Sequence, residues 1–203
     1  MAENETDFKW VAIILAAGSS SRMGRPKQFL KIDGETLIRK SANAALGASP
    51  NETIIVSGLD HDLIKNELRG LPLQIVVNPN SEMGMGSSLK FGLNFMIRNL
   101  PDFDAALIMV CDQPLLTSVH LKEVISEYKV ARSPIVASFY SGRNGVPVLF
   151  HRSMFEKLLT IKDQQGAKNI IEQNLSLVKS VDFPEGVIDL DTPEDLKNMK
   201  HET

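Results

Sequence analysis

The fold class of this 203-residue chain follows from one stretch near its start, Trp10-Val11-Ala12-Ile13-Ile14-Leu15-Ala16-Ala17-Gly18. The first six of these residues are all apolar, so they lack the alternation of a half-exposed strand. A second apolar run extends from Ala105 to Cys111. Strands that are apolar throughout are typical of parallel sheets that helices cover on both faces. The two runs therefore predict neighbouring strands in the middle of a mostly parallel sheet.

Short β-branched segments alternate with longer amphipathic ones along the rest of the chain, which is typical of βαβ units. The expected strands are Trp10–Leu15, Thr53–Ser57, Gln74–Asn78, Ala105–Cys111, Ile135–Phe139, Val146–Phe150 and Leu177–Val181. The expected helices are Thr36–Leu46, His61–Leu68, Ser87–Ile97, Ser118–Val130, Ser153–Leu159 and Ala167–Gln173. Residues 141–145 are expected to form a loop. We expect an N-terminal tail over residues 1–9 and one domain over residues 10–203.

Composition excludes several classes of protein. The chain is 43% hydrophobic and 23% charged, as expected of a folded globular protein with one substantial core. Its 22 Lys and Arg against 25 Asp and Glu give a net charge of −3, which argues against nucleic acid as a partner. No apolar run approaches the ~20 residues of a membrane-spanning helix, and no signal peptide is recognisable, so a cytoplasmic protein is expected. With one cysteine and four scattered histidines, neither a disulfide nor a zinc site is expected.

The segment after the first strand, Leu15 to Lys27, indicates an anion site. It carries three cations, Arg22, Arg25 and Lys27, and no acidic residue. Glycines let backbone N–H groups approach phosphate oxygens closely, while Arg can fork onto two oxygens and Lys can supply a point charge. The Gly-Lys-Ser/Thr ending of a P-loop and the G-x-G-x-x-G pattern of dinucleotide-binding folds are both absent.

Asp112 follows the second apolar strand, where ligands of a parallel sheet bind. A carboxylate oxygen is a ligand that Mg²⁺ prefers, together with the phosphates of a substrate. The alternative is an Asp that serves the turn before Pro114. Cys111 has no neighbouring histidine, so we expect it to pack in the core rather than act as a nucleophile.

A third segment of interest, Asn78 to Leu89, joins a strand to a helix through glycines and hydroxyl residues. Ser87 is expected to cap the helix, accepting from an N–H group of its first turn. Met83 and Met85 could line a pocket, and flexible apolar filling is the simpler interpretation.

Three segments together resemble one family. They are Ala16-Ala17-Gly18-x-x-x-Arg22-Met23-Gly24-x-x-Lys27, Gly84-Met85-Gly86-Ser87-Ser88-Leu89 and Cys111-Asp112-Gln113-Pro114-Leu115. They resemble the motifs of the molybdenum cofactor cytidylyltransferases, in the MobA-like NTP transferase superfamily. The resemblance implies an α/β, single-domain, Rossmann-like nucleotidyltransferase fold with a mostly parallel central sheet and helices on both faces.

The resemblance also implies roles for individual residues. The base and ribose would be cradled by Leu15, Ala16, Ala17 and Gly18, with Gly84 and Ser87 in the base-recognition loop. Arg22 would hold the triphosphate, Lys27 its outer phosphates and Asp112 the Mg²⁺ ion, so these three are the expected catalytic residues.

Two later regions resemble further motifs of the family. Asp189-Leu190-Asp191-Thr192-Pro193 resembles its closing motif, which makes Asp191 a candidate second metal contact, although an Asp before a helix also favours the helix dipole. The segments 143–147 and 163–168 resemble regions near the acceptor substrate. The family commonly has Gly-Asp-x-Gly-Ala-Arg, whereas this chain has Asp163, Gln164 and Lys168 at the first, second and last of these positions. These departures leave the acceptor open.

The activity implied is transfer of CMP from CTP to the phosphate of molybdenum-loaded molybdopterin, with Mg²⁺ and with release of pyrophosphate. A molybdoenzyme or a chaperone would receive the product. Ala17 favours CTP, because the guanylyl-transferring relatives have Gly there. Gln28-Phe29-Leu30 resembles the methylerythritol phosphate cytidylyltransferases, which remain an alternative. A guanylyltransferase of the same fold, or a nucleotide-binding module without catalysis, is also kept open.

Overall fold

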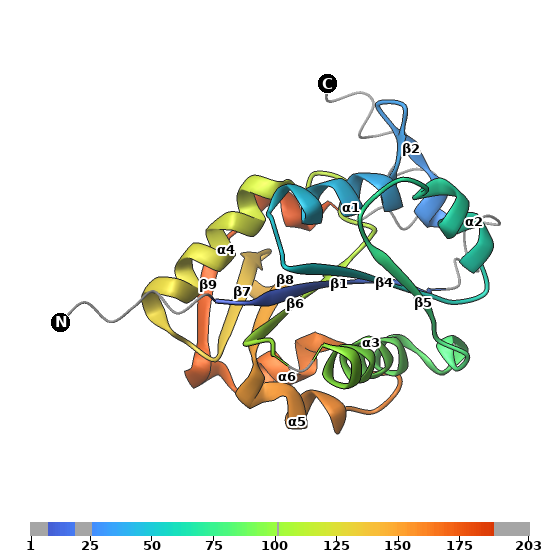
Figure 1. The fold of residues 1–203 in the computed structure, drawn as a ribbon. Helices are drawn as coiled ribbons and strands as arrows, with labels where there is room; N and C mark the ends of the chain where they lie inside the picture. The colour runs from blue at the N-terminus through green and yellow to red at the C-terminus, as the bar shows by residue number, and fades with distance from the viewer. Residues whose placement is uncertain (1–7, 19–25, 101, 189–203) are drawn as a thin grey trace.

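A computed structural model describes residues 8–18, 26–100 and 102–188, and these form one seven-stranded sheet with helices on both sides (Figure 1). The strand order is β5-β4-β1-β6-β8-β7-β9. The strands are β1 (Trp10–Ala16), β4 (Glu52–Ser57), β5 (Gln74–Val77), β6 (Ala105–Val110), β7 (Ile135–Tyr140), β8 (Arg143–His151) and β9 (Val178–Asp182). A separate two-stranded hairpin is formed by β2 (Lys31–Ile32) and β3 (Glu35–Thr36).

Only β8 runs against the other strands of this sheet, pairing antiparallel with both β6 and β7. The remaining pairs, β1 with β4, β1 with β6, β4 with β5 and β7 with β9, are parallel. The mostly parallel sheet is therefore confirmed, and so is the expectation that the two apolar runs, now β1 and β6, lie side by side. Both are buried along their whole length.

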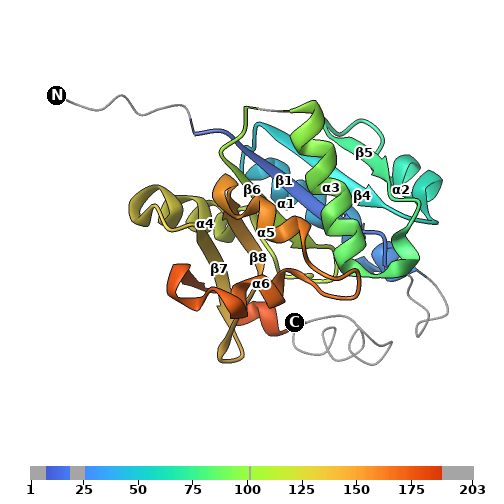
Figure 2. The same ribbon diagram turned by 90° about the horizontal axis from the view of Figure 1, so that it is seen from below.

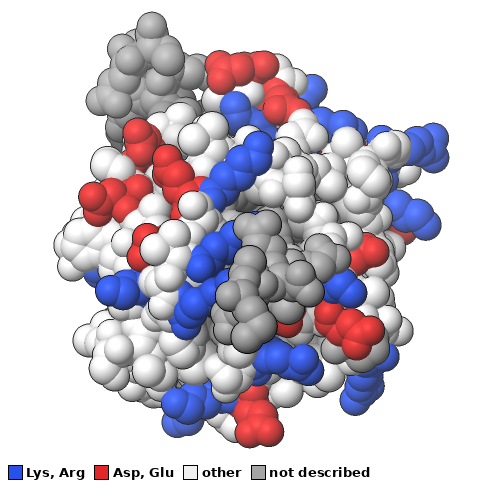
Figure 3. Space-filling view, turned by 60° about the vertical axis from the view of Figure 1, so that its left-hand side comes forward, with Lys and Arg blue, Asp and Glu red and all other residues white. Residues whose placement is uncertain are grey.

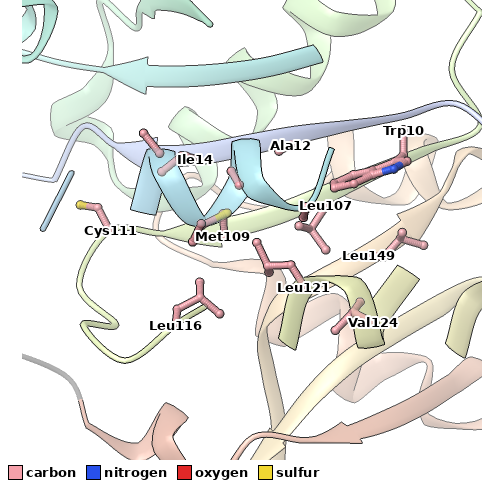
Figure 4. Close-up of a cluster of buried hydrophobic side chains, with 14 of the residues drawn as sticks. Trp10, Ala12, Ile14, Leu107, Met109, Cys111, Leu116, Leu121, Val124 and Leu149 are labelled. Atoms are coloured by element: carbon pink, nitrogen blue, oxygen red, sulfur yellow. The ribbon is translucent and has the colours of Figure 1, made fainter. Parts of the chain in front are cut away.

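Two layers of helices cover the sheet. The helices α1 (Leu37–Gly47) and α4 (Ser118–Ala131) lie on one face, and α3 (Met85–Asn99), α5 (Phe155–Leu159) and α6 (Ala167–Gln173) lie on the other (Figures 1 and 2). The short helix α2 (His61–Glu67) follows β4. Each face has its own core cluster. Figure 4 shows the cluster under α1 and α4, in which Trp10 and Cys111 lie at opposite ends.

The sequence fits these helices locally. Thr36 begins α1, where its hydroxyl accepts from the backbone N–H of Arg39, and Thr117 begins α4 in the same way through His120. A Thr side chain at this position satisfies one of the N–H groups that the first helical turn leaves without a partner. Apolar residues then recur on one face of each helix and are buried against the sheet.

The structure corrects three local expectations. The loop expected over residues 141–145 is limited to Ser141 and Gly142, because β8 already begins at Arg143. Both residues have positive φ, 50° and 72°, and a two-residue turn of this kind matches the twist of the strands it joins. Helix α3 begins at Met85, two residues before the expected start, and the segment from Ser153 is a 3₁₀ turn (Arg152–Met154) before α5.

The end of the expected N-terminal tail packs against the domain. Phe8 stacks on Tyr128 with ring centroids 4.6 Å apart, and the backbone N–H of Lys9 donates to the Asp104 carboxylate. On the face seen in Figure 3, acidic and basic side chains are interspersed. Among the residues that the structure describes, no helix has the length and apolar character needed to cross a membrane.

Candidate active site

A cavity of about 350 Å³ opens where β1 and β6 end. It is lined by Leu15, Ala16, Ala17, Gly18, Lys27, Gln28, Ser81, Glu82, Gly84, Met85, Ser88, Val110, Cys111 and Asp112. These residues come from four separate parts of the chain, because β1, β6 and β5 run parallel and their carboxyl ends meet at one edge of the sheet. The cavity thus brings together the glycine-containing loop, the expected phosphate-binding cation and the expected metal-binding acid.

Lys27 and Asp112 form an ion pair across 85 residues of sequence. The Lys27 Nζ atom lies 2.7 Å from Oδ2 of Asp112, and the two side chains are 23% and 22% exposed. Both groups remain accessible to a ligand in the cavity at this exposure. When a metal–phosphate complex enters such a cavity, the cation can leave the carboxylate and contact a phosphate. The carboxylate can then bind the metal.

Cys111 lies on the wall of the same cavity but has no nucleophilic character. Burial raises the pKa of its thiol to about 12, and the neighbouring Asp112 carboxylate raises it further than Lys27 lowers it. The thiolate is the reactive form, so this cysteine stays protonated and inert near neutral pH.

The start of α3 forms another part of the wall. Gly84 has φ 124°, a backbone conformation that residues other than glycine rarely adopt. A Cβ atom at Gly84 would lie 2.5 Å from the carbonyl oxygen of Asp163, and one at Gly86 would overlap the carbonyl of Lys162. Glycine at these two positions therefore lets residues 162–165 approach the helix start closely.

Ser87 does not cap α3, so that expectation is wrong. The helix start has no side-chain cap; the Asp163 carbonyl accepts from the N–H groups of Gly86 and Ser87 instead. The Ser87 hydroxyl donates to the carbonyl of Asn80 and accepts from the Asn78 amide, which also donates to Ser88. Ser87 thereby fastens the preceding loop, and its neighbour Ser88 lines the cavity.

Several lining residues were not predicted as site residues, namely Gln28, Ser81, Glu82, Met85, Ser88, Val110 and Cys111. The Gln28 side chain is nearly fully buried and donates to the Asp60 carboxylate at 2.9 Å. The signal for Ser88 was present in the Ser-Ser pair of the motif, but only the observed phase of α3 tells which serine faces the cavity. Arg22 and Asp191, both predicted site residues, lie outside the described residues, as does the predicted helix start at Thr192.

Gln113 connects the Asp112 loop to the antiparallel part of the sheet. Its side chain is 4% exposed, and its Nε2 atom donates to the carbonyls of Val146 at 3.1 Å and Gly186 at 3.5 Å. Its Oε1 atom is buried without a hydrogen-bond partner among the described residues. Gln113 thus holds three segments together directly beside the cavity.

The described residues fit a metal that takes most of its ligands from a substrate. No three of their His, Cys, Asp and Glu side chains are grouped so that they could hold a metal ion by themselves. Asp112 is a partly exposed carboxylate at the cavity wall. Mg²⁺ is commonly held by one or two carboxylates together with phosphate oxygens and water, so this donor set suits such an ion.

The chain is similar in sequence or fold to several known proteins. The chain is 26% identical over 198 residues to the purine catabolism protein PucB of Bacillus subtilis, covering 91% of this chain and 93% of that protein. It is 28% identical over 214 residues to nicotine blue oxidoreductase of Paenarthrobacter nicotinovorans, covering 96% and 98%. The fold matches the manganese complex of Rv0371c from Mycobacterium tuberculosis, with a TM-score of 0.76, 22% identity and coverage of 96% and 100%.

The family model described as the MobA-like NTP transferase domain matches residues 12–178. This range extends from β1 to the start of β9 and includes Lys27, Gly84 and Asp112. The chain belongs to the MobA-like NTP transferase family.

Proposed function

We propose that this chain is a magnesium-dependent cytidylyltransferase that transfers CMP from CTP to the phosphate of molybdenum-loaded molybdopterin and releases pyrophosphate. The observation that carries the proposal is the cavity in which Lys27 and Asp112 meet the loop Leu15–Gly18. A cavity of about 350 Å³ is within the usual size range of small-molecule sites.

Positioning and charge neutralisation supply most of the catalysis in this proposal. The loop after β1 receives the base and ribose, and Gly84 forms part of the cavity wall beside them. Lys27 exchanges its contact with Asp112 for the outer phosphates, and Arg22 holds the triphosphate. Asp112, with Asp191 as a second candidate, would hold a divalent ion, which neutralises charge on the phosphates when bound.

The acceptor phosphate needs no strong base. An oxygen of the acceptor phosphate forms a new bond to the α-phosphorus of CTP while the bond from that phosphorus to the bridging oxygen of pyrophosphate breaks in line. The second pKa of a phosphate monoester is near ~6, so the attacking oxygen is already deprotonated at neutral pH. This agrees with a cavity whose described lining contains no histidine.

The choice of CTP and of the acceptor rests on resemblance. Ala17, which lines the cavity, stands where guanylyl-transferring relatives have Gly, and this favours CTP over GTP. The acceptor is proposed from the motifs shared with the molybdenum cofactor cytidylyltransferases, and a molybdoenzyme or chaperone would then collect the product. The methylerythritol phosphate type, the guanylyl type and a module that only binds nucleotide are the alternatives.

A second candidate function comes from one relative, which is named an oxidoreductase. An activity of this kind would be a redox reaction at the cavity rather than transfer of a nucleotide. The inert Cys111 thiol provides no redox group of its own.

The test is an assay of pyrophosphate release with Mg²⁺ and molybdenum-loaded molybdopterin, with CTP, GTP and ATP offered separately. Methylerythritol phosphate serves as a second acceptor. We expect release with CTP and the pterin alone. Preference for GTP would overturn the use of Ala17, and release with methylerythritol phosphate would assign the other branch. Binding of CTP without release for any acceptor would favour a nucleotide-binding module.

A further inference from the structure

The segment Lys162–Gly166 lies behind the cavity wall formed by Gly84 and Met85. The carbonyl oxygen of Asp163 accepts from Gly86 N at 2.8 Å and from Ser87 N at 3.3 Å. The segment is a closed turn, because Lys162 N donates to the Gln165 side chain and Gln165 N donates to the Lys162 carbonyl. The position of this turn therefore fixes the position of the first turn of α3.

One side-chain contact fastens the turn to the helix. Lys90 Nζ lies 2.7 Å from Oδ1 of Asp163, and each side chain is 25% exposed. Lys90 is on α3, one turn after the residues that the Asp163 carbonyl caps. Asp163 thus contacts α3 twice, through its main chain and through its carboxylate. A carboxylate near the start of a helix is also favoured by the helix dipole.

We propose that Lys90 and Asp163 are positioning residues for nucleotide binding, because their ion pair keeps the Gly84–Met85 wall of the cavity in the conformation that accepts the nucleotide. This inference rests on the proposed function for the identity of the ligand. It gives a reason for Asp at position 163, where the related motif commonly has Gly.

The ion pair acts on the wall and not on the whole fold. Leu89, Leu93 and Met96 anchor α3 in the core, and Ile161 and Ala167 anchor both ends of the turn. When the pair is broken, the helix and the turn stay in place while the contact between them opens more often. A nucleotide that binds only the closed form then loses apparent affinity in proportion to the fraction of closed molecules.

The pair should affect nucleotide binding more than the chemical step. Lys27 begins the 3₁₀ turn Lys27–Phe29 and Asp112 follows β6, so both belong to elements other than the turn Lys162–Gly166. At saturating nucleotide the wall is held closed by the ligand. We therefore expect variants at this pair to raise KM and Kd for the nucleotide while kcat remains within about twofold.

The experiment compares Asp163→Asn, Asp163→Lys and the exchanged pair Lys90→Asp/Asp163→Lys. All keep the main-chain cap, so they isolate the side-chain contact. Two quantities are measured: the Kd for CTP with Mg²⁺ by calorimetry, and hydrogen exchange of the Gly86 and Ser87 amides without any ligand. The control is Glu172→Lys, which reverses one charge of the more exposed pair Lys168–Glu172 on α6.

We expect Asp163→Asn to raise Kd about threefold and Asp163→Lys about tenfold, with faster exchange at both amides, as a partly exposed ion pair and its reversal should produce. The exchanged pair should recover Kd to within about threefold of the wild type, and Glu172→Lys should change nothing. Unchanged Kd and exchange in Asp163→Lys would overturn the inference, and so would failure of the exchanged pair to recover. If the wild type binds no nucleotide, the proposed function fails, whereas unchanged amide exchange still refutes the positioning role by itself.

Discussion

The two halves of the sheet contribute to the site in different ways. In the parallel half, β5, β1 and β6 end at one edge, and the residues that follow them line the cavity with side chains such as Lys27 and Asp112. In the other half, β8 and the elements after it contribute mainly main-chain carbonyls, those of Val146, Asp163 and Gly186. The side chains on which the chemistry depends thus lie in the parallel half. The other half contributes the main-chain hydrogen bonds that hold the site in position.

The largest effect expected from this difference is the loss of turnover when the Asp112 carboxylate, which belongs to the parallel half, is removed. Asp112→Asn keeps the shape of the side chain but removes its charge, so we expect pyrophosphate release to fall about 10²–10³-fold. Circular dichroism should show an intact fold. The exposed carboxylate Asp62, replaced in the same way, is the control. Turnover within tenfold of the wild type would show that Asp112 is not a catalytic residue.

The contacts with the other half should contribute to the free energy of unfolding. In Gln113→Glu a carboxylate would face the carbonyls of Val146 and Gly186 in a buried position, and we expect a loss of about 3 kcal/mol in the free energy of unfolding. Gln113→Met should cost only about 1 kcal/mol, since it also removes an acceptor that has no partner among the described residues. Urea unfolding measures both, and equal losses would contradict the assigned hydrogen bonds.

A smaller effect concerns the ion pair between Lys27 and Asp112. The ammonium group competes with a metal for the carboxylate, so Lys27→Met should strengthen binding of Mn²⁺ alone by about fivefold to tenfold. The same variant should weaken binding of CTP. Electron paramagnetic resonance of free Mn²⁺ measures the first affinity, with Asp112→Asn as the variant that should abolish it. Weaker Mn²⁺ binding in Lys27→Met would show that the lysine does not compete with the metal.

The smallest effect comes from His120, which lies in the other half. Its Nε2 atom lies 2.7 Å from the Ser138 hydroxyl, and its ring stacks on Phe183. Burial lowers its pKa below the ordinary 6.5, although Glu123 and Glu185 act in the opposite direction. Asp182 lines the same surface pocket as His120. The unfolded chain therefore binds a proton more readily, so this contribution to stability is present above pH 6.5 and is lost as the pH falls.

Between pH 7.5 and 5.5 we expect the Tm of the wild type to fall by about 1–2 °C more than that of His120→Gln. Glutamine keeps a donor for Ser138 but does not titrate in this range. Differential scanning calorimetry checks the difference, and parallel curves for the two proteins would rule out a lowered pKa at His120.

The same comparison explains what the sequence predicted. The parallel order around β1 and β6 followed from apolar strands, and Lys27 and Asp112 followed from charges placed after such strands. The other predicted lining residues, Leu15–Gly18 and Gly84, came from the resemblance to a family. The antiparallel direction of β8 was not predicted, although the connection between Phe139 and Val146 is too short for a parallel crossover. The carbonyl of Asp163 left no motif, since every residue type offers a carbonyl. Ser87 and Ser88 could not be told apart without the phase of α3.

The position of Cys111 has a practical consequence. It is the only thiol of the chain, 7% exposed at the end of β6 and on the cavity wall. A thiol reagent reaches it through the cavity or through local opening of the strand end, so the rate of labelling reports the accessibility of this wall. The native chain thus carries its own probe, placed beside Asp112, with which the protection given by any added nucleotide or metal can be followed without turnover.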